Sequence, residues 1–141
     1  MSFFPQPSTR LVPGKGRKES KIAFVGDYTT PFDEKDLEPF KGPNGTVLDT
    51  CLHAAGLIRE DLYLTNVFKS KTRVPGKNAN TDFFVDDGKK RHFTALGLEH
   101  VKMLHDELRG VGANIIVAAG NPALMALTSH NSGAGYRGYI T

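Results

Sequence analysis

The chain has 141 residues, of which 39% are hydrophobic and 23% are charged, and its net charge is +3. These values are ordinary for one globular domain and exclude a largely disordered chain. No apolar run approaches the ~18 residues of a membrane span, and the start lacks the order of a secretory signal, so we expect a cytoplasmic protein without a membrane partner. The single cysteine, Cys51, excludes an internal disulfide and a cluster held by several thiolates. We expect no cofactor and no metal.

The first part of the chain alternates between polar segments and short apolar ones. Residues 1–20 contain three prolines and a GKGRK run, which predicts a basic extended arm ahead of one domain at residues 21–141. The apolar residues 22–25 predict a strand buried on both faces that ends at Gly26. Asn44 is the predicted cap of a helix whose apolar stripe runs to Ala55, with Gly56 as its stop. The β-branched and aromatic residues 62–69 predict a second strand.

The second part continues this alternation after a long polar stretch at residues 70–92, which we expect to be a loop. Apolar residues three and four apart between positions 98 and 111 predict a helix, and residues 115–119 predict a third buried strand. Asn121 and Pro122 open a short helix that ends near Thr128. The order of elements predicts an α/β fold of three layers, α/β/α, around a central parallel sheet of about four strands.

Local motifs for other chemistries lack the context that those chemistries need. The GAGYRG run at residues 133–138 matches the spacing of a dinucleotide-binding loop, but it follows a predicted helix instead of a strand. No two of the five histidines are four residues apart on a predicted helix, so zinc catalysis has no local support. Cys51 falls on the apolar stripe of its predicted helix, where a buried hydrophobic role is favoured over a nucleophilic one.

Ligands of parallel sheets collect beyond the carboxyl ends of the strands, and four features of the chain fall there. Asp27 follows Gly26, Phe40 lies in a Pro-Phe-Lys-Gly loop, Asn66 lies near the end of the second strand, and Asn121 follows the third. An amide offers the donor and the acceptor that match the edge of uracil or thymine, and an aromatic face stacks on a base for about 1–3 kcal/mol. We therefore expect Phe40 and Asn66 to close on a slot sized for a pyrimidine.

At these residues the sequence resembles the uracil-DNA glycosylase superfamily, most closely its iron-sulfur branch and the phage relatives of that branch. The matching blocks, in chain order, are Gly26-Asp27, Asp33-Glu34, Pro39-Phe40-Lys41-Gly42, Gly45, Gly56-Leu57-Ile58-Arg59 and Thr65-Asn66-Val67-Phe68-Lys69. The resemblance resumes at IIVAAGNPALMAL and at Arg137-Gly138, and it spans about residues 21–141.

The resemblance implies a uracil-DNA glycosylase-like fold, in a form that we expect to be truncated, and cleavage of an N-glycosidic bond in DNA. In the family a phenylalanine stacks on the extruded uracil, an asparagine reads its pairing edge, and an acidic residue helps to position the attacking water. These roles fall on Phe40, Asn66 and Asp27, with Gly26 also at the base, and the base must leave the stack to reach them. We expect contacts to the DNA backbone from Lys41, Lys69, Lys71, Arg73, Asn121 and Arg137.

Four departures from the family pattern bear on activity. Asp27 is one methylene shorter than the glutamate of the family motif. Ser70 stands where iron-sulfur members have a cysteine, and their N-terminal cysteine pair is absent, so no cluster is expected. The family's His-Pro-Ser-type segment, whose histidine stabilises the departing uracil anion, has no counterpart up to Thr141, so we expect the C-terminal part of the fold to be missing.

Three functions stay open at this point, and with them the question of whether the chain is an enzyme. The first is a glycosylase for uracil in single-stranded or duplex DNA, active alone or once a second polypeptide supplies the missing segment. The second is a catalytically inactive DNA-binding module associated with a phage-type DNA polymerase. Grouped basic residues at positions 10–21, 69–77 and 89–91 suit DNA, although solvated loops are also rich in lysine. The third is an α/β domain that binds a small nucleotide.

Overall fold

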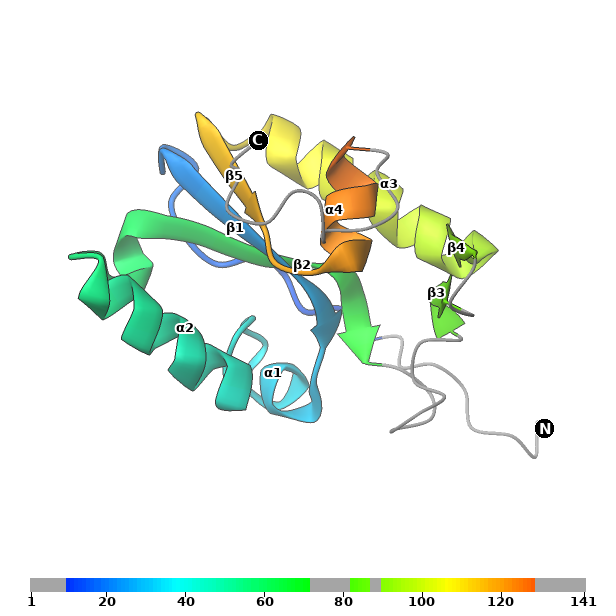
Figure 1. Ribbon diagram of the computed structural model, residues 1–141, viewed down its shortest axis with the longest axis horizontal. Coiled ribbons are helices and arrows are strands. Elements are labelled where there is room, and N and C mark those ends of the chain that lie inside the picture. The colour runs from blue at the N-terminus through cyan, green and yellow to red at the C-terminus, as the bar shows by residue number, and fades with distance from the viewer. Residues whose placement is uncertain (1–9, 72–81, 87–89, 129–141) are drawn as a thin grey trace.

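The computed structural model describes residues 10–71, 82–86 and 90–128. Its central sheet has three parallel strands in the order β2-β1-β5, namely β1 (Ile22–Thr29), β2 (Leu62–Lys71) and β5 (Ile115–Ala118). Helices α1 (Pro31–Asp36) and α2 (Pro43–Ala54) cover one face, and α3 (Ala95–Arg109) and α4 (Asn121–Thr128) cover the other (Figure 1). The predicted three-layer α/β/α class is confirmed. The described residues give the central sheet three strands, where about four were expected.

The strand order places the candidate site. The chain leaves β1, returns as β2 on one side of it, and then crosses over to β5 on the other side. Right-handed crossovers in opposite directions put α2 and α3 on opposite faces and leave a crevice at the carboxyl end of β1. Strand β1 extends to Thr29, three residues beyond the predicted end at Gly26, so Gly26 and Asp27 lie inside the strand and share its rigidity.

Two helix starts differ from the prediction. Helix α2 is capped by Gly42 and has Pro43 in its first turn, so the prediction of Asn44 as its cap is wrong. Helix α1 was not predicted, although Thr30 and Asp33 form a capping box at its start, in which each side chain accepts the backbone N–H of the other. Within the described ranges, no helix combines the length and the apolar character that crossing a membrane would require.

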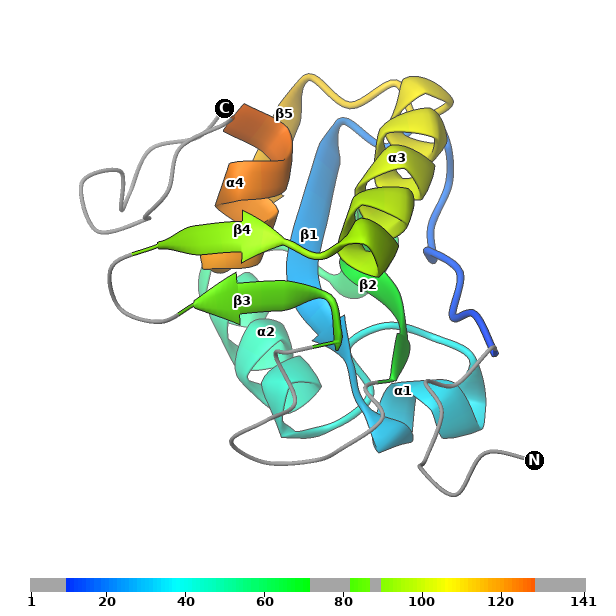
Figure 2. The same ribbon diagram turned by 90° about the vertical axis from the view of Figure 1, so that its right-hand side faces the viewer.

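The predicted polar loop at residues 70–92 contains two short strands, β3 (Phe84–Asp86) and β4 (Arg91–Phe93), which pair antiparallel. Figure 2 shows this pair on the same side of the sheet as α3 and α4. The aromatic residues of this segment enter the main core, in which Phe83 stacks on Phe68 at 4.9 Å. A second apolar cluster, formed by Leu48, Leu52, Leu62 and Leu64, fixes α2 to the other face of the sheet. The short 3-10 helix η1 (Arg59–Asp61) leads into β2.

Residues 10–20, the described part of the predicted arm, run along the outer edge of β2. The amide of Val12 donates to the carbonyl of Lys69 at 2.7 Å, and Lys15 exchanges two backbone hydrogen bonds with Leu64 at 2.7 and 2.8 Å. Val12 is buried. Because these bonds satisfy backbone groups at the sheet edge, this segment extends the sheet and covers that edge.

Candidate functional site

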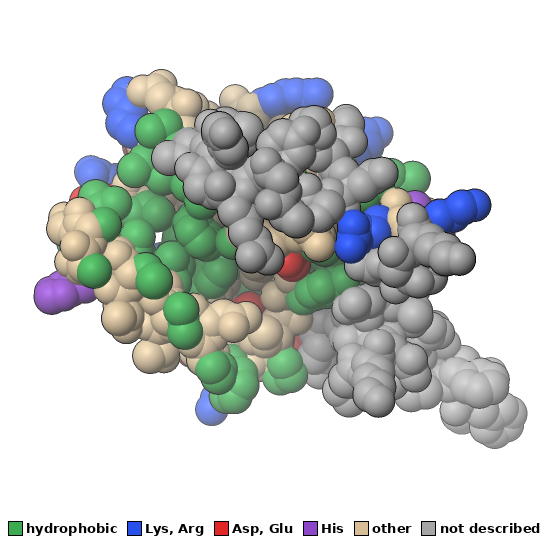
Figure 3. All heavy atoms as spheres, viewed as in Figure 1, with side chains coloured by type: hydrophobic (Ala, Val, Ile, Leu, Met, Phe, Trp, Pro, Cys, Tyr) green, Lys and Arg blue, Asp and Glu red, His purple; other side chains and the backbone are tan. Residues whose placement is uncertain are grey.

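A cavity of about 810 Å³ opens at the carboxyl ends of β1 and β2, beneath the first turns of α1 and α2. Its wall is mostly apolar and includes the four residues Gly26, Asp27, Phe40 and Asn66. Figure 3 shows the hollow between α2 and the sheet, lined by hydrophobic side chains. Its volume and its few polar groups fit a site for a small molecule or a single base.

Phe40 and Asn66 meet across Gly26. A Cβ atom on residue 26 would lie 2.5 Å from Oδ1 of Asn66 and 2.7 Å from Cζ of Phe40, so only glycine leaves room for both side chains. Gly26 and Asn66 are also direct partners in the β1-β2 register. The structure therefore brings together an aromatic ring and an amide that are 26 positions apart in the sequence.

The amide of Asn66 lies at the cavity wall and has no hydrogen-bond partner among the described residues. Asn66 is 5% exposed, and no described residue forms a hydrogen bond with its side chain. Most buried polar groups in proteins are paired, so an unpaired amide at a cavity wall indicates a group held ready for a ligand.

Phe40 has a strained backbone. Its φ of 59° lies in the left-handed region, which for a bulky residue costs about 1–3 kcal/mol and is typical of functional sites. The ring packs edge to face against Phe24, with centroids 5.4 Å apart at an angle of 75°. The strained backbone of Phe40 and the contact with Phe24 thus hold the aromatic ring in one position at the cavity wall.

Asp27 combines partial burial with one backbone hydrogen bond. Its Oδ1 accepts the amide N–H of Ala123 in the first turn of α4 at 3.0 Å, and its carboxyl group packs directly against Gly120, where a Cβ atom would clash with it. Burial raises the pKa of Asp27 to about 7, although the bond from Ala123 lowers it in part. A carboxyl group that changes charge near neutral pH is suited to general acid or base catalysis.

The residues predicted to contact the DNA backbone differ in exposure and in their distance from the cavity. Lys41 is exposed and lies 3.7 Å from Asp36, and Asn121 begins α4 at the same edge of the sheet as the cavity. Lys69 is 6% exposed and pairs with Glu107 of α3, so its ammonium group cannot reach a phosphate and the prediction for it is wrong. The side chain of Lys71 is not among the described parts of the chain, and Arg73 and Arg137 lie outside the described residues.

Two residues that support the site were not identified from the sequence. Asp33 and Arg59 both hydrogen-bond the backbone around Phe40. The capping box of Asp33 was readable from the spacing Thr-x-x-Asp, but its bond to Lys41 was not. Arg59 stood in a matching block of the resemblance, yet its contact with Phe40 spans 19 residues and no local pattern indicates it.

Comparison with known proteins decides the family. The family model described as the uracil-DNA glycosylase superfamily matches residues 13–140. The chain belongs to this superfamily. It is 45% identical over 65 residues to the type-4 uracil-DNA glycosylase of Archaeoglobus fulgidus, covering 45% of the chain and 32% of that protein. It is 33% identical over 82 residues to the type-4 enzyme of Thermotoga maritima, covering 55% of the chain and 43% of that protein.

These matches confirm the resemblance to the superfamily and to its iron-sulfur branch. A third relative, the type-4 uracil-DNA glycosylase of Sulfurisphaera tokodaii, is 34% identical over 64 residues, covering 45% of the chain and 29% of that protein. In all three cases the chain spans less than half of the relative's own length.

The donor set of this chain does not fit the iron-sulfur cluster of that branch. Four thiolates are needed, and the chain has one cysteine. That residue, Cys51, is exposed on α2, so the prediction that it is buried is wrong. Ser70 is buried in β2, and the described residues contain no group of three potential metal ligands. The chemistry of the site therefore has to be derived from the side chains of the cavity alone.

Proposed function

We propose that the chain binds a uracil extruded from DNA and hydrolyses its N-glycosidic bond. The observation that carries the proposal is the amide of Asn66, which faces Phe40 across Gly26 at the cavity wall and has no hydrogen-bond partner among the described residues. Membership of the superfamily and the printed names of the relatives support the same reaction.

Recognition follows from the two side chains at Gly26. The amide of Asn66 offers one donor and one acceptor to the pairing edge of uracil. The ring of Phe40 offers a stacking face worth about 1–3 kcal/mol, comparable to the few kcal/mol that extrusion of the base costs. Stacking and hydrogen bonding in the cavity thus offset the free energy that extrusion of the base costs.

Asp27 supplies the catalytic carboxylate. In its ionised form it orients a water molecule toward C1′ of the deoxyribose and stabilises the positive charge that develops on the sugar. The bond between C1′ and N1 breaks, the water oxygen bonds to C1′ and passes a proton to the carboxylate of Asp27, and uracil leaves as an anion with the bonding electron pair. Because the pKa of Asp27 is raised to about 7, the active ionised fraction grows as the pH rises through neutrality.

The direct test is incubation with a single-stranded oligonucleotide that contains one uracil, followed by detection of abasic sites. A matched oligonucleotide with cytosine in that position is the control, because cytosine presents a different pairing edge. We expect abasic sites only in the uracil strand. Uracil-specific binding without abasic sites at high protein excess would refute the enzyme. That result would favour a DNA-binding module that works with a polymerase or with a second polypeptide.

The DNA partner is tested separately by the salt dependence of binding. We propose that five residues contact the DNA backbone. Two of them, Lys41 and Asn121, have described side chains, and the other three are Lys71, Arg73 and Arg137. Affinity for an oligonucleotide should then fall steeply as the salt concentration rises, because phosphate contacts release counterions. Affinity that does not change with salt would contradict a DNA partner and would favour a small-nucleotide pocket.

A further inference from the structure

We propose that Asp33 and Arg59 form a two-charge clamp on the peptide bond between Phe40 and Lys41, and that they are positioning residues for the stacking ring. The inference rests on the proposed function, because it assigns the clamp a role in recognition of the base. It concerns the loop at residues 37–42, which joins α1 to α2 and carries Phe40 to the cavity wall.

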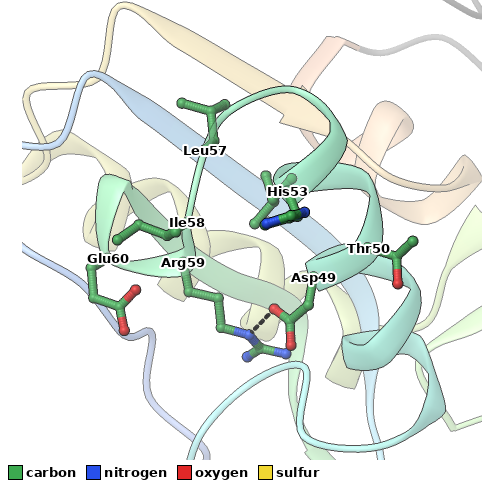
Figure 4. Close-up of a pocket in the computed structure, with 8 residues that line it drawn as sticks. Asp49, Thr50, His53, Leu57, Ile58, Arg59 and Glu60 are labelled. Carbon is green, nitrogen blue, oxygen red and sulfur yellow. Dashed lines mark hydrogen bonds and ion pairs between the residues drawn. The ribbon is translucent and has the colours of Figure 1, made fainter.

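Arg59 holds the carbonyl side of this peptide bond. Its Nη2 donates a hydrogen bond to the carbonyl of Phe40, and its Nη1 donates to the carbonyl of Pro39 at 3.5 Å. Its Nε lies 2.5 Å from Oδ1 of Asp49 on α2, and Figure 4 shows this ion pair between α2 and η1. The planar guanidinium group directs several donors at once, so it ties two successive carbonyls of the loop to a helix.

Asp33 holds the amide side of the same peptide bond. Its Oδ1 accepts the N–H of Lys41 at 2.9 Å, and its Oδ2 accepts the N–H of Thr30 at 3.2 Å. Asp33 is 3% exposed, and hydrogen bonds from amides to a carboxylate are among the stronger ones in proteins. Its carboxylate is itself fixed by the capping box of α1.

The two charges permit one orientation of the peptide plane. If this peptide turned over, its carbonyl would face the carboxylate of Asp33 and its N–H would face the guanidinium of Arg59. Both contacts would be repulsive. With the carbonyls of Pro39 and Phe40 both drawn toward Arg59, the backbone of Phe40 is held near its φ of 59°.

The backbone conformation of Phe40 decides where its ring lies. Left-handed geometry is unfavourable for phenylalanine, so without the clamp the residue should relax toward negative φ and its Cβ should change direction. The ring would then leave Gly26 and Asn66, and the cavity would lose its stacking face. Loss of the clamp should therefore weaken uracil recognition and leave sequence-independent DNA binding unchanged.

The experiment uses Arg59→Lys, which keeps the charge and removes the fork of donors. The matched control is Arg109→Lys, because Arg109 is exposed on α3 and pairs with Asp106 at 2.8 Å, away from the cavity. The first measurement is the intraresidue amide-to-Hα nuclear Overhauser effect of Phe40 in the free protein, which is strong at positive φ. The second is the affinity for a uracil oligonucleotide relative to its cytosine counterpart, because cytosine presents a different pairing edge to Asn66.

We expect Arg59→Lys to weaken the Overhauser effect and to reduce the uracil preference by about fivefold or more, the equivalent of one stacking contact. The affinity for the cytosine strand should stay the same, and Arg109→Lys should change neither measurement. If Arg59→Lys does not fold, Asp33→Asn is the second variant, because it removes the negative charge that would repel the carbonyl of a turned-over peptide. An unchanged Overhauser effect in a folded clamp variant overturns the clamp. A weakened effect in a protein whose wild type shows no uracil preference supports the clamp and refutes the proposed function.

Discussion

Thr65 and Asn66 are neighbours on β2, both are buried, and their surroundings are opposite. The hydroxyl group of Thr65 donates to Glu107 of α3 at 3.0 Å, in a network that also includes Tyr63 and Lys69. Asn66 points to the other face of the sheet and makes no side-chain hydrogen bond with a described residue. Alternation along a strand separates the two, so one strand builds a structural network on one face and a cavity wall on the other.

The difference shows how to tell a structural polar group from a functional one. On the α3 face each polar group has its partner: Tyr63 donates to Glu107 at 2.7 Å, and the backbone N–H of Lys69 donates to Nδ1 of His100 at 2.8 Å. Burial lowers the pKa of His100 to about 4, which keeps it neutral as that acceptor. Burial also lowers the pKa of Lys69, although the carboxylate of Glu107 opposes this effect. Nothing in this network requires a ligand.

The largest effect should come from the cavity side, at Asp27. Asp27→Asn keeps an oxygen that can accept the N–H of Ala123, so the fold should persist, but it removes the charge that orients water. We expect the rate of abasic-site formation to fall about 10²–10⁴-fold, measured with enzyme in excess over a uracil oligonucleotide. The wild-type rate should rise with pH and level off above about 7. Full activity of Asp27→Asn would exclude Asp27 as the catalytic carboxylate.

A change of comparable size, in the free energy of unfolding, is expected for the network around Glu107. Glu107→Ala leaves the buried ammonium group of Lys69 without its counter-charge, and the free energy of unfolding should fall by about 3–5 kcal/mol in chemical denaturation. The double variant Lys69→Met/Glu107→Leu should recover much of this loss, because it removes both charges. If Glu107→Ala destabilised the protein no more than an exposed control such as Asp106→Ala, the network would not be structural.

Sequence reasoning predicted the elements that depend on local patterns. The apolar runs of β1, β2 and β5 and the helical spacing of α3 gave the layers and the edge at which ligands collect. It placed Asp27, Phe40 and Asn66 at that edge, and the structure brings them to one cavity. The strands β3 and β4 were missed because their stability comes from packing of Phe83 and other aromatic residues into the core, which no local pattern shows.

The error at Lys69 was avoidable. Residues 66 and 69 are an odd number of positions apart on one strand, so their side chains lie on opposite faces, and both cannot line one DNA-binding surface. Other features could not be foreseen. The left-handed conformation of Phe40 and its contact with Arg59 depend on residues distant in the sequence.

A smaller, paired effect should sharpen the contrast between Thr65 and Asn66. Asn66→Ala removes no hydrogen bond within the described structure, so its stability should change by less than about 1 kcal/mol, while uracil affinity falls by about 1–3 kcal/mol. Thr65→Val should do the reverse: it removes a bond to Glu107 and costs about 1 kcal/mol of stability without a change in base preference. Thermal unfolding measures the change in stability, and binding to uracil and cytosine strands measures the base preference. Equal effects of the two variants on binding would contradict the division of β2 into two faces.

The last effect is the pH dependence of stability that Asp27 contributes. Its pKa is raised in the folded protein from 3.8 to about 7, so the folded state binds an extra proton between these values. The stability due to the protonated form is therefore complete below pH 3.8 and is lost as the pH rises through about 7. Asp27→Asn should lack this loss, so the wild type should become less stable relative to the variant over that range in denaturant titrations. A difference that stayed constant with pH would mean that the carboxyl titrates normally. The range in which stability declines is also the range in which the ionised carboxylate forms, so the same burial that tunes the catalytic group makes its charged state costly to the fold.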